Sequence, residues 1–166
     1  MKNRDRIGPH LALRILEETE RMARESAEGQ AMELGWRQDN ATHLSESDYL
    51  EMSLKKTCWV GIIYPSRVGA IIGTCDNADL DTFIRFGFFL GAAFQIQDDL
   101  LNLAPDEHYG KECNGDIWEG KRTLMVIRLF QEATPEEHGR LTKILQVKRR
   151  ERTQEDIDWV RGLMDK

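Results

Sequence analysis

The chain has 166 residues, of which 40% are hydrophobic and 31% are charged, an ordinary balance for one soluble globular domain. Its formal net charge is −6, which argues against a nucleic acid as the main partner, because a phosphate backbone needs a basic face. Three cysteines without a CxxC pair argue against a disulfide framework or a zinc site.

The N-terminal residues MKNRDRIGPH contain no apolar signal-peptide core. The longest apolar run, Phe86 to Phe94, is too short to span a bilayer, and we interpret it as part of a buried helix. Together with the cysteine usage, these features predict a cytoplasmic protein without a transmembrane segment.

Apolar residues recur mostly at helical spacing, and the alternation typical of strands is rare. The sequence therefore predicts an all-α fold. The longer helices are expected over residues 9–36, 48–64, 66–75, and from 77 or 79 to about 103. Two or three shorter helices are expected to follow.

Several residues mark the ends of these helices. Ser45 or Ser47 is the expected N-cap of the second helix, and Pro65 is expected to break or kink the chain after it. Residues 104–122 hold a proline and glycines among charges, which predicts a loop. The breaks between the later helices are expected near Thr134–Pro135 and Lys148–Thr153.

The long helix carries an acidic patch near its C-terminal end. Four polar side chains at i, i+3, i+4 and i+7 share one of its faces: Gln95, Asp98, Asp99 and Asn102. The helix dipole is unfavourable for anions at this end, so two adjacent carboxylates there call for a cation. Hard oxygen ligands suit Mg²⁺, which usually takes one or two carboxylates plus substrate phosphates. The alternative is a solvated acidic helix end.

Lysines stand out in two other segments. Lys56, followed by Thr57, projects from a largely apolar predicted helix, and the alternative is a lysine that reaches the surface along its own stem. Lys111 and Lys121 lie in the glycine-punctuated stretch after the acidic helix, where glycines let a backbone approach a phosphate. The alternative there is a plain surface loop.

The order of these motifs is specific. Lys56-Thr57, FQIQDD over 94–99, Gly110-Lys111 and GDIWEGKRT over 115–123 together resemble the trans-isoprenyl diphosphate synthase family, also called polyprenyl synthetases. The resemblance runs from the Gly29-Gln30 pair to about Val126.

The resemblance implies a helical bundle of the isoprenoid synthase type around a deep pocket. It implies a prenyltransferase that uses Mg²⁺ to condense an allylic diphosphate with isopentenyl diphosphate, head to tail. We expect residues 1–166 to form a single partial domain that is incomplete at its N-terminus. The expected partner is a second copy, as a homodimer, or a polypeptide that supplies the N-terminal half.

The resemblance also implies roles for individual residues. Asp98 matches the leading metal ligand, and Asp99 its supporting neighbour. Asn102 stands where the family usually has a third aspartate, so it would be at most a weak ligand. The residues implied for the allylic diphosphate are Lys56, Gln95, Lys111 and Lys121. The residues implied as catalytic are Lys56, Thr57 and Lys111.

The first Asp-rich motif of the family, DDxxD, does not occur before Lys56. We therefore expect the isolated chain to be inactive. Its function is then either that of one part of a synthase or that of a non-catalytic subunit that tunes a full-length synthase. A class I terpene synthase relative is a third alternative, against which the three lysine motifs argue. A plain helical interaction module would leave the order of the motifs unexplained.

Overall fold

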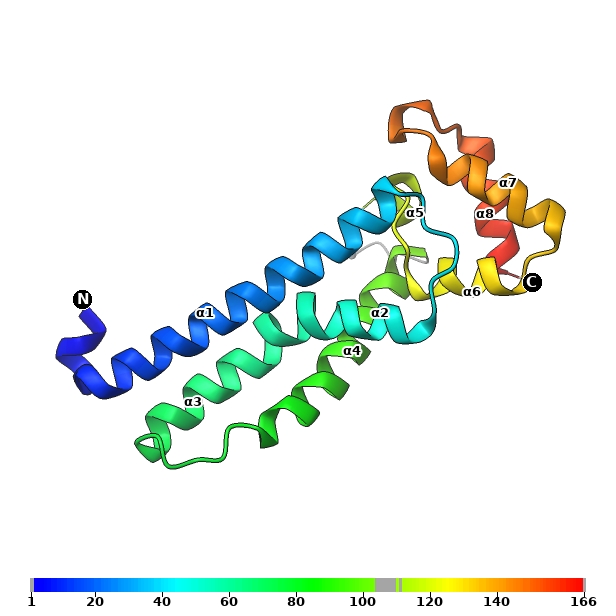
Figure 1. Ribbon diagram of the computed structural model, residues 1–166. Coiled ribbons are helices and arrows are strands. Elements are labelled where there is room, and N and C mark those ends of the chain that lie inside the picture. The colour runs from blue at the N-terminus through cyan, green and yellow to red at the C-terminus, as the bar shows by residue number, and fades with distance from the viewer. Residues whose placement is uncertain (1, 104–109, 111, 166) are drawn as a thin grey trace. The chain divides into compact units, whose positions relative to one another are not determined.

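The computed structural model describes residues 2–103, 110 and 112–165, and over these residues the chain is helical without a strand (Figure 1). The all-α prediction is confirmed. In chain order, the helices are α1 (Lys2–Gln38), α2 (Glu46–Ser53), η1 (Leu54–Ile63), α3 (Tyr64–Thr74), α4 (Thr82–Leu103), α5 (Gly115–Glu119), α6 (Leu124–Glu132), α7 (Pro135–Gln146), η2 (Arg149–Glu151) and α8 (Gln154–Met164). None of these described helices is long and apolar enough to cross a membrane.

The chain divides into two compact units. Unit 1 comprises Met1–Ala31 and Glu51–Phe94, and unit 2 comprises Met32–Leu50 and Gln95–Lys166. The division falls inside α1 and inside α4, so each of these two helices contributes to both units. The single domain expected over 1–166 stays a prediction.

Helix α1 begins with a short turn that is separated from the rest of the helix at Gly8. Gly8 has φ +82° and ψ 162°, a conformation that glycine adopts without strain. Pro9 follows and disfavours the helical conformation in the residue before it. The regular part of α1 therefore starts at Pro9, as the sequence predicted.

Of the two predicted N-cap candidates, Ser45 and Ser47, Ser45 makes the capping bonds of the second helix. Its hydroxyl accepts a hydrogen bond from the backbone N–H of Asp48 at 3.2 Å, and the Asp48 carboxylate accepts from the backbone N–H of Ser45 at 2.7 Å. This reciprocal pair satisfies two backbone donors at the start of α2.

Helix η1 is a π-helix where the sequence predicted the continuation of an α-helix over 48–64. π-Helices are rare and are frequently found at functional sites. Of the break or kink expected at Pro65, the break is not found, because the chain passes from η1 directly into α3. Pro65 lies in the first turn of α3, and its missing N–H does not end the run of helix that continues from η1.

Three glycines let α1 and α4 approach η1 at backbone distance within unit 1. A Cβ atom at Gly29 would lie 2.4 Å from the backbone nitrogen of Lys56, and one at Gly91 would lie 2.8 Å from the Cα of Cys58. A Cβ atom at Gly87 would lie 2.3 Å from Cγ1 of Ile63. Any side chain at Gly29 or Gly91 would force the helices apart.

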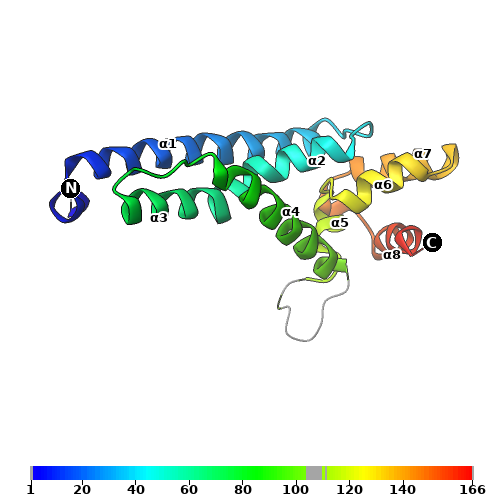
Figure 2. The same cartoon turned by 90° about the horizontal axis from the view of Figure 1, so that it is seen from below.

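A buried ion pair joins α3 to α1. Arg67 donates from Nε and Nη2 to the two carboxylate oxygens of Glu18, at 2.6 and 2.8 Å, and from Nη1 to the carbonyl oxygen of Leu80 at 3.0 Å. Both charged side chains are almost fully buried. Removing one partner would leave an uncompensated buried charge, so the pair fixes how α3 lies alongside the first part of α1 (Figure 2).

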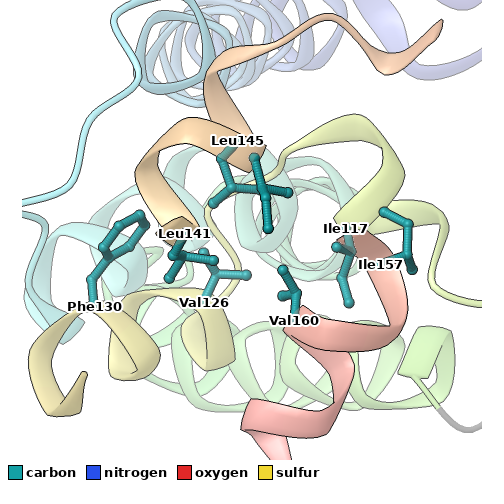
Figure 3. Packing of buried hydrophobic residues seen from close by; sticks show 8 residues of the cluster. Ile117, Val126, Phe130, Leu141, Leu145, Ile157 and Val160 are labelled. Carbon is teal, nitrogen blue, oxygen red and sulfur yellow. The ribbon is translucent and has the colours of Figure 1, made fainter. Parts of the chain in front are cut away.

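The core of unit 2 is an apolar cluster between α5, α6, α7 and α8 (Figure 3). Its buried members are Ile117, Val126, Phe130, Leu141, Ile144, Leu145, Ile157 and Val160. Burying each such side chain contributes roughly 1.5–3 kcal/mol to the free energy of unfolding.

Helix α5 corrects the loop predicted over 104–122. It is only five residues long, begins after Asn114 in the left-handed region and ends at Gly120, which has φ +69°. A helix this short has almost no propensity of its own. It forms because Ile117, at 1% exposure, is buried in the unit 2 core.

The later helices begin at threonine caps. Thr134 with Glu137 and Thr153 with Asp156 form capping boxes at the starts of α7 and α8. These caps confirm the breaks predicted near Thr134–Pro135 and Lys148–Thr153.

We predict that Gly91→Ala lowers the free energy of unfolding by about 1–3 kcal/mol, because the new methyl group would meet the Cα of Cys58. Gly69→Ala is the matched control. Gly69 lies in α3 with nothing within 4 Å of its Cβ position, so alanine there should raise stability by roughly 0.5–1 kcal/mol. Urea unfolding followed by circular dichroism measures both changes, and similar effects at the two positions would contradict the close helix approach.

Candidate functional site

The acidic end of α4 is built around a buried carboxylate. Asp99 is 5% exposed, and both of its oxygens accept hydrogen bonds within unit 2. The Tyr49 hydroxyl donates to Oδ2 at 2.7 Å, and the Gln95 side-chain amide donates to Oδ1 at 2.8 Å. Asp99 is therefore fixed in one orientation, while Asp98 beside it is half-buried.

Burial raises the pKa of Asp99 from its ordinary value of 3.8 to about 6, and the nearby charge of Asp116 acts in the same direction. The hydrogen bonds from Tyr49 and Gln95 and the charge of Lys121 favour the ionised form and oppose this rise. Ionising Asp99 therefore costs free energy unless a nearby cation offsets the negative charge.

Lys121 supplies one cation. Its Nζ lies 2.6 Å from Oδ1 of Asp116. Burial lowers the pKa of Lys121, but the hydrogen bond and charge of Asp116, with the charges of Glu119 and Glu33, outweigh that effect, so the pKa is raised. Lys121 is therefore held as a charged side chain close to the carboxylates.

Asn102 joins the end of α4 to the start of α5. Its Oδ1 accepts from the backbone N–H of Asp116 at 2.9 Å, and its Nδ2 donates to the carbonyl oxygen of Glu112 at 3.4 Å. The backbone carbonyl of Asn102 accepts from the N–H of Asn114 at 2.9 Å. The weak metal role predicted for Asn102 stays a prediction, and this geometry favours a structural use of its amide.

The predicted site residues fall into both units. Unit 2 brings together Asp99, Gln95 and Lys121, with Asp98 and Asn102 on the same helix. Lys56 and Thr57 lie half-buried in η1 of unit 1. Lys111 lies outside the described residues. The convergence of Lys56, Lys111 and Lys121 on one diphosphate stays a prediction.

Lys55, next to Lys56 in the sequence, forms ion pairs with α1. Lys55 Nζ lies 3.1 Å from Glu25 and 2.7 Å from Glu28, both on α1. The hydrogen bonds to Glu28 and Glu25 raise the pKa of Lys55. Lys55 thus bridges η1 to α1.

Two members of the site had no role assigned from the sequence. Tyr49 lies 50 positions before Asp99, and Asp116 lies 14 positions after Asn102, so both contacts depend on tertiary structure. The signal available was weak: Tyr49 is an aromatic residue in an amphipathic helix, and Asp116 belongs to the GDIWEGKRT motif.

Residues 5–164 match the family model described as polyprenyl synthetase. The chain belongs to the polyprenyl synthetase family.

Several members of this family resemble the chain closely. A short chain isoprenyl diphosphate synthase of Methanothermobacter thermautotrophicus is 37% identical over 119 residues, covering 71% of this chain and 36% of that protein. The geranylgeranyl diphosphate synthase of Saccharolobus solfataricus is 34% identical over 133 residues, covering 80% and 39%. Both proteins are named for the synthesis of isoprenyl diphosphates.

Solved structures agree with this family assignment. A geranylgeranyl pyrophosphate synthetase from Pyrococcus horikoshii matches with a TM-score of 0.75 at 30% identity, covering 96% of this chain and 47% of that one. A polyprenyl synthase from Caulobacter crescentus, complexed with calcium and isoprenyl diphosphate, matches with a TM-score of 0.77 at 31% identity, covering 92% and 45%. The chain spans between about a third and a half of the length of these relatives.

The carboxylates of α4 fit a magnesium ion that takes most of its ligands from elsewhere. No group of three or more His, Cys, Asp or Glu side chains gathers in the described part of the chain, so an all-protein cage is not formed there. Mg²⁺ usually keeps waters and binds one or two carboxylates plus phosphates. Asp98 could be such a ligand, whereas the oxygens of Asp99 already accept two hydrogen bonds and suit a supporting role.

We predict that Asp99 makes the stability of the metal-free chain depend on pH. The folded-state pKa is about 6 and the ordinary value is 3.8, so the stability that Asp99 contributes is fully present below about pH 4. It is lost as the pH rises through 6, by up to about 3 kcal/mol. Asp99→Asn lacks this titration and should gain stability relative to the wild type between pH 4 and pH 7.

Urea unfolding in EDTA at several pH values measures this difference. Asp158→Asn, an exposed position on α8, is the matched control and should follow the wild type. Parallel pH profiles of the wild type and Asp99→Asn would show that Asp99 is not held in the buried, proton-binding state.

Proposed function

We propose that this chain carries the metal- and allylic-diphosphate-binding part of an isoprenyl diphosphate synthase. The reaction is the Mg²⁺-dependent condensation of an allylic diphosphate with isopentenyl diphosphate. The observation that carries the proposal is the family match over residues 5–164, combined with Asp98 beside an Asp99 held by Tyr49 and Gln95.

The chemistry follows from where charge develops. Breaking the allylic C–O bond leaves a carbocation and pyrophosphate, so preorganised cations aimed at the departing diphosphate lower the barrier. A bound Mg²⁺ would neutralise phosphate oxygens there as a Lewis acid. Asp98 would hold the ion, and Asp99 would keep that stretch of helix in one orientation through its two hydrogen bonds.

The lysines would supply the remaining positive charge. Lys121 would bind the diphosphate together with Lys56 and Lys111, and Thr57 would lie near the reacting carbon. Gln95 would line the same diphosphate. Asp116 supports this role for Lys121, because the ion pair keeps Lys121 charged and in place.

The proposal includes a second contributor. The sequence lacks DDxxD before Lys56, and a half-site would bind Mg²⁺ weakly and leave the diphosphate in water. The run Phe86 to Phe94 was predicted to be buried, and that prediction is wrong for its largest side chains: Phe86 is 56% exposed, Phe89 61% and Phe94 64%. Such a surface calls for a covering polypeptide or a hydrocarbon chain.

We predict that Asp98→Ala abolishes the Mg²⁺-dependent part of allylic diphosphate binding, because a metal bridge needs its carboxylate. Titration calorimetry with dimethylallyl diphosphate, with Mg²⁺ and with EDTA, measures that part. Asp158→Ala removes an exposed carboxylate of α8 and should bind like the wild type. If Asp98→Ala bound the diphosphate in the presence of Mg²⁺ as tightly as the wild type does, Asp98 would not be a metal ligand.

We predict that the isolated chain makes no prenyl diphosphate. Incubation with dimethylallyl diphosphate, radiolabelled isopentenyl diphosphate and Mg²⁺ should give no more butanol-extractable label than Asp98→Ala gives. Adding a polypeptide that carries the N-terminal half with DDxxD should restore product formation. Product from the chain alone would contradict the need for a second contributor.

The same assay distinguishes the alternative of a non-catalytic subunit. If the chain is regulatory, its Asp98→Ala variant should still change the rate of a full-length synthase to which it is added. A catalytic part would lose its effect with that substitution.

A further inference from the structure

Unit 2 contains a hollow whose charge is opposite to that of the whole chain. The hollow has a volume of about 560 Å³ and lies between the end of α1, the end of α5 and the segment around η2. Four basic residues line it, namely Arg37, Lys148, Arg149 and Arg152, against one acidic residue, Glu119. The chain as a whole carries a formal charge of −6.

Arg152 is the buried member of this group of basic residues. It is 8% exposed and donates to the carbonyl oxygens of Ile144 at 3.0 Å, Leu145 at 2.9 Å and Ile117 at 3.1 Å, and also to that of Trp118. These carbonyls belong to the ends of α7 and α5. Arg152 therefore satisfies the negative ends of both helices and leaves a net positive charge below the hollow.

A second buried arginine, Arg122, is repelled by the positive charges of Arg152 and Arg37. Arg122 is 2% exposed and donates to the carbonyl oxygens of Ala41 and Gly120 and to Oδ1 of Asn40. Burial and the charges of Arg152 and Arg37 lower the pKa of Arg122 to about 10. The positive charges are close enough to destabilise one another.

Hydrogen bonds to uncharged oxygen atoms account for the burial of Arg152 and Arg122, but not for the outer residues of the hollow. Arg149 is balanced by Glu112 and Glu119. Arg37 and Lys148 make no ion pair with any carboxylate of the described residues, although both line the same hollow. Two cations without such an ion pair, lining the same hollow as the buried Arg152, form an arrangement suited to binding an anion.

We propose that this hollow is a binding site for a phosphate-bearing anion, separate from the carboxylates of α4. Arg37 and Lys148 would contact the phosphate oxygens, and Gln38 and Gln146, which also line the hollow, offer amide donors. The site needs no metal ion, because its charge comes from the side chains alone.

The test is titration calorimetry of the chain with inorganic phosphate and with pyrophosphate, in EDTA and at low ionic strength. Arg37→Gln should weaken binding about tenfold, because it removes a charge-assisted hydrogen bond. Arg152 caps two helix ends and is unsuited to this test, whereas Arg37 is only half-buried at the end of α1. Circular dichroism checks that the Arg37→Gln variant is folded. Lys148→Gln should weaken binding in the same direction.

Lys143→Gln is the matched control. Lys143 is an exposed lysine of α7 outside the hollow, so this variant loses the same charge and should bind like the wild type. Asp98→Ala should also bind like the wild type, which separates this site from the proposed Mg²⁺ site. Tighter binding of pyrophosphate than of phosphate would assign the site to diphosphate-bearing ligands, and equal binding to monophosphates.

Two results would overturn the proposal. One is no binding of either anion to the wild type, and the other is equal weakening by Arg37→Gln and Lys143→Gln, which would mean that only the net charge matters. Neither result depends on whether the chain takes part in prenyl transfer.

Discussion

The structure of unit 1 depends on the contact of η1 with glycines of two neighbouring helices. At Gly29 and Gly91 the missing side chains let α1 and α4 approach the backbone of η1, at Lys56 and Cys58 respectively. Contacts with a backbone cannot be relieved by changing a rotamer, so they fix both the register and the separation of the helices. The backbone of Lys56 is thereby held against α1, which gives a candidate phosphate ligand a rigid support.

Unit 2 shows how a carboxylate can be kept in a largely buried place. Asp99 is expensive to ionise because it is buried, yet hydrogen bonds from Tyr49 and Gln95 hold it in position. The Lys121–Asp116 pair brings a compensating cation close by. The result is a rigid helix end at which negative charge is only partly offset, and a bound metal ion would add the missing positive charge.

The buried arginines follow a different principle. Carboxylates neutralise Arg67 in unit 1, whereas uncharged oxygen atoms, mostly backbone carbonyls, satisfy Arg152 and Arg122 in unit 2. Carbonyl dipoles orient a guanidinium without cancelling its charge. The positive charge of Arg152 is therefore not cancelled, and Arg152 lines the hollow. This explains how a chain with a negative net charge can present a basic surface there.

Local patterns in the sequence predict the all-helical class, most helix ends and the family. Helical periodicity is local, and so are the Ser45, Thr134 and Thr153 caps and the motif around Asp98. Other features depend on contacts between residues that are distant in the sequence, and they appear only in the folded chain. These features are the π-helical form of η1, the helix α5 around buried Ile117 inside a predicted loop, and the contact of Tyr49 with Asp99 across 50 residues. None of these has a local signal, because the energy that stabilises each comes from close backbone approach, apolar burial or a buried hydrogen bond that exists only once the helices have packed.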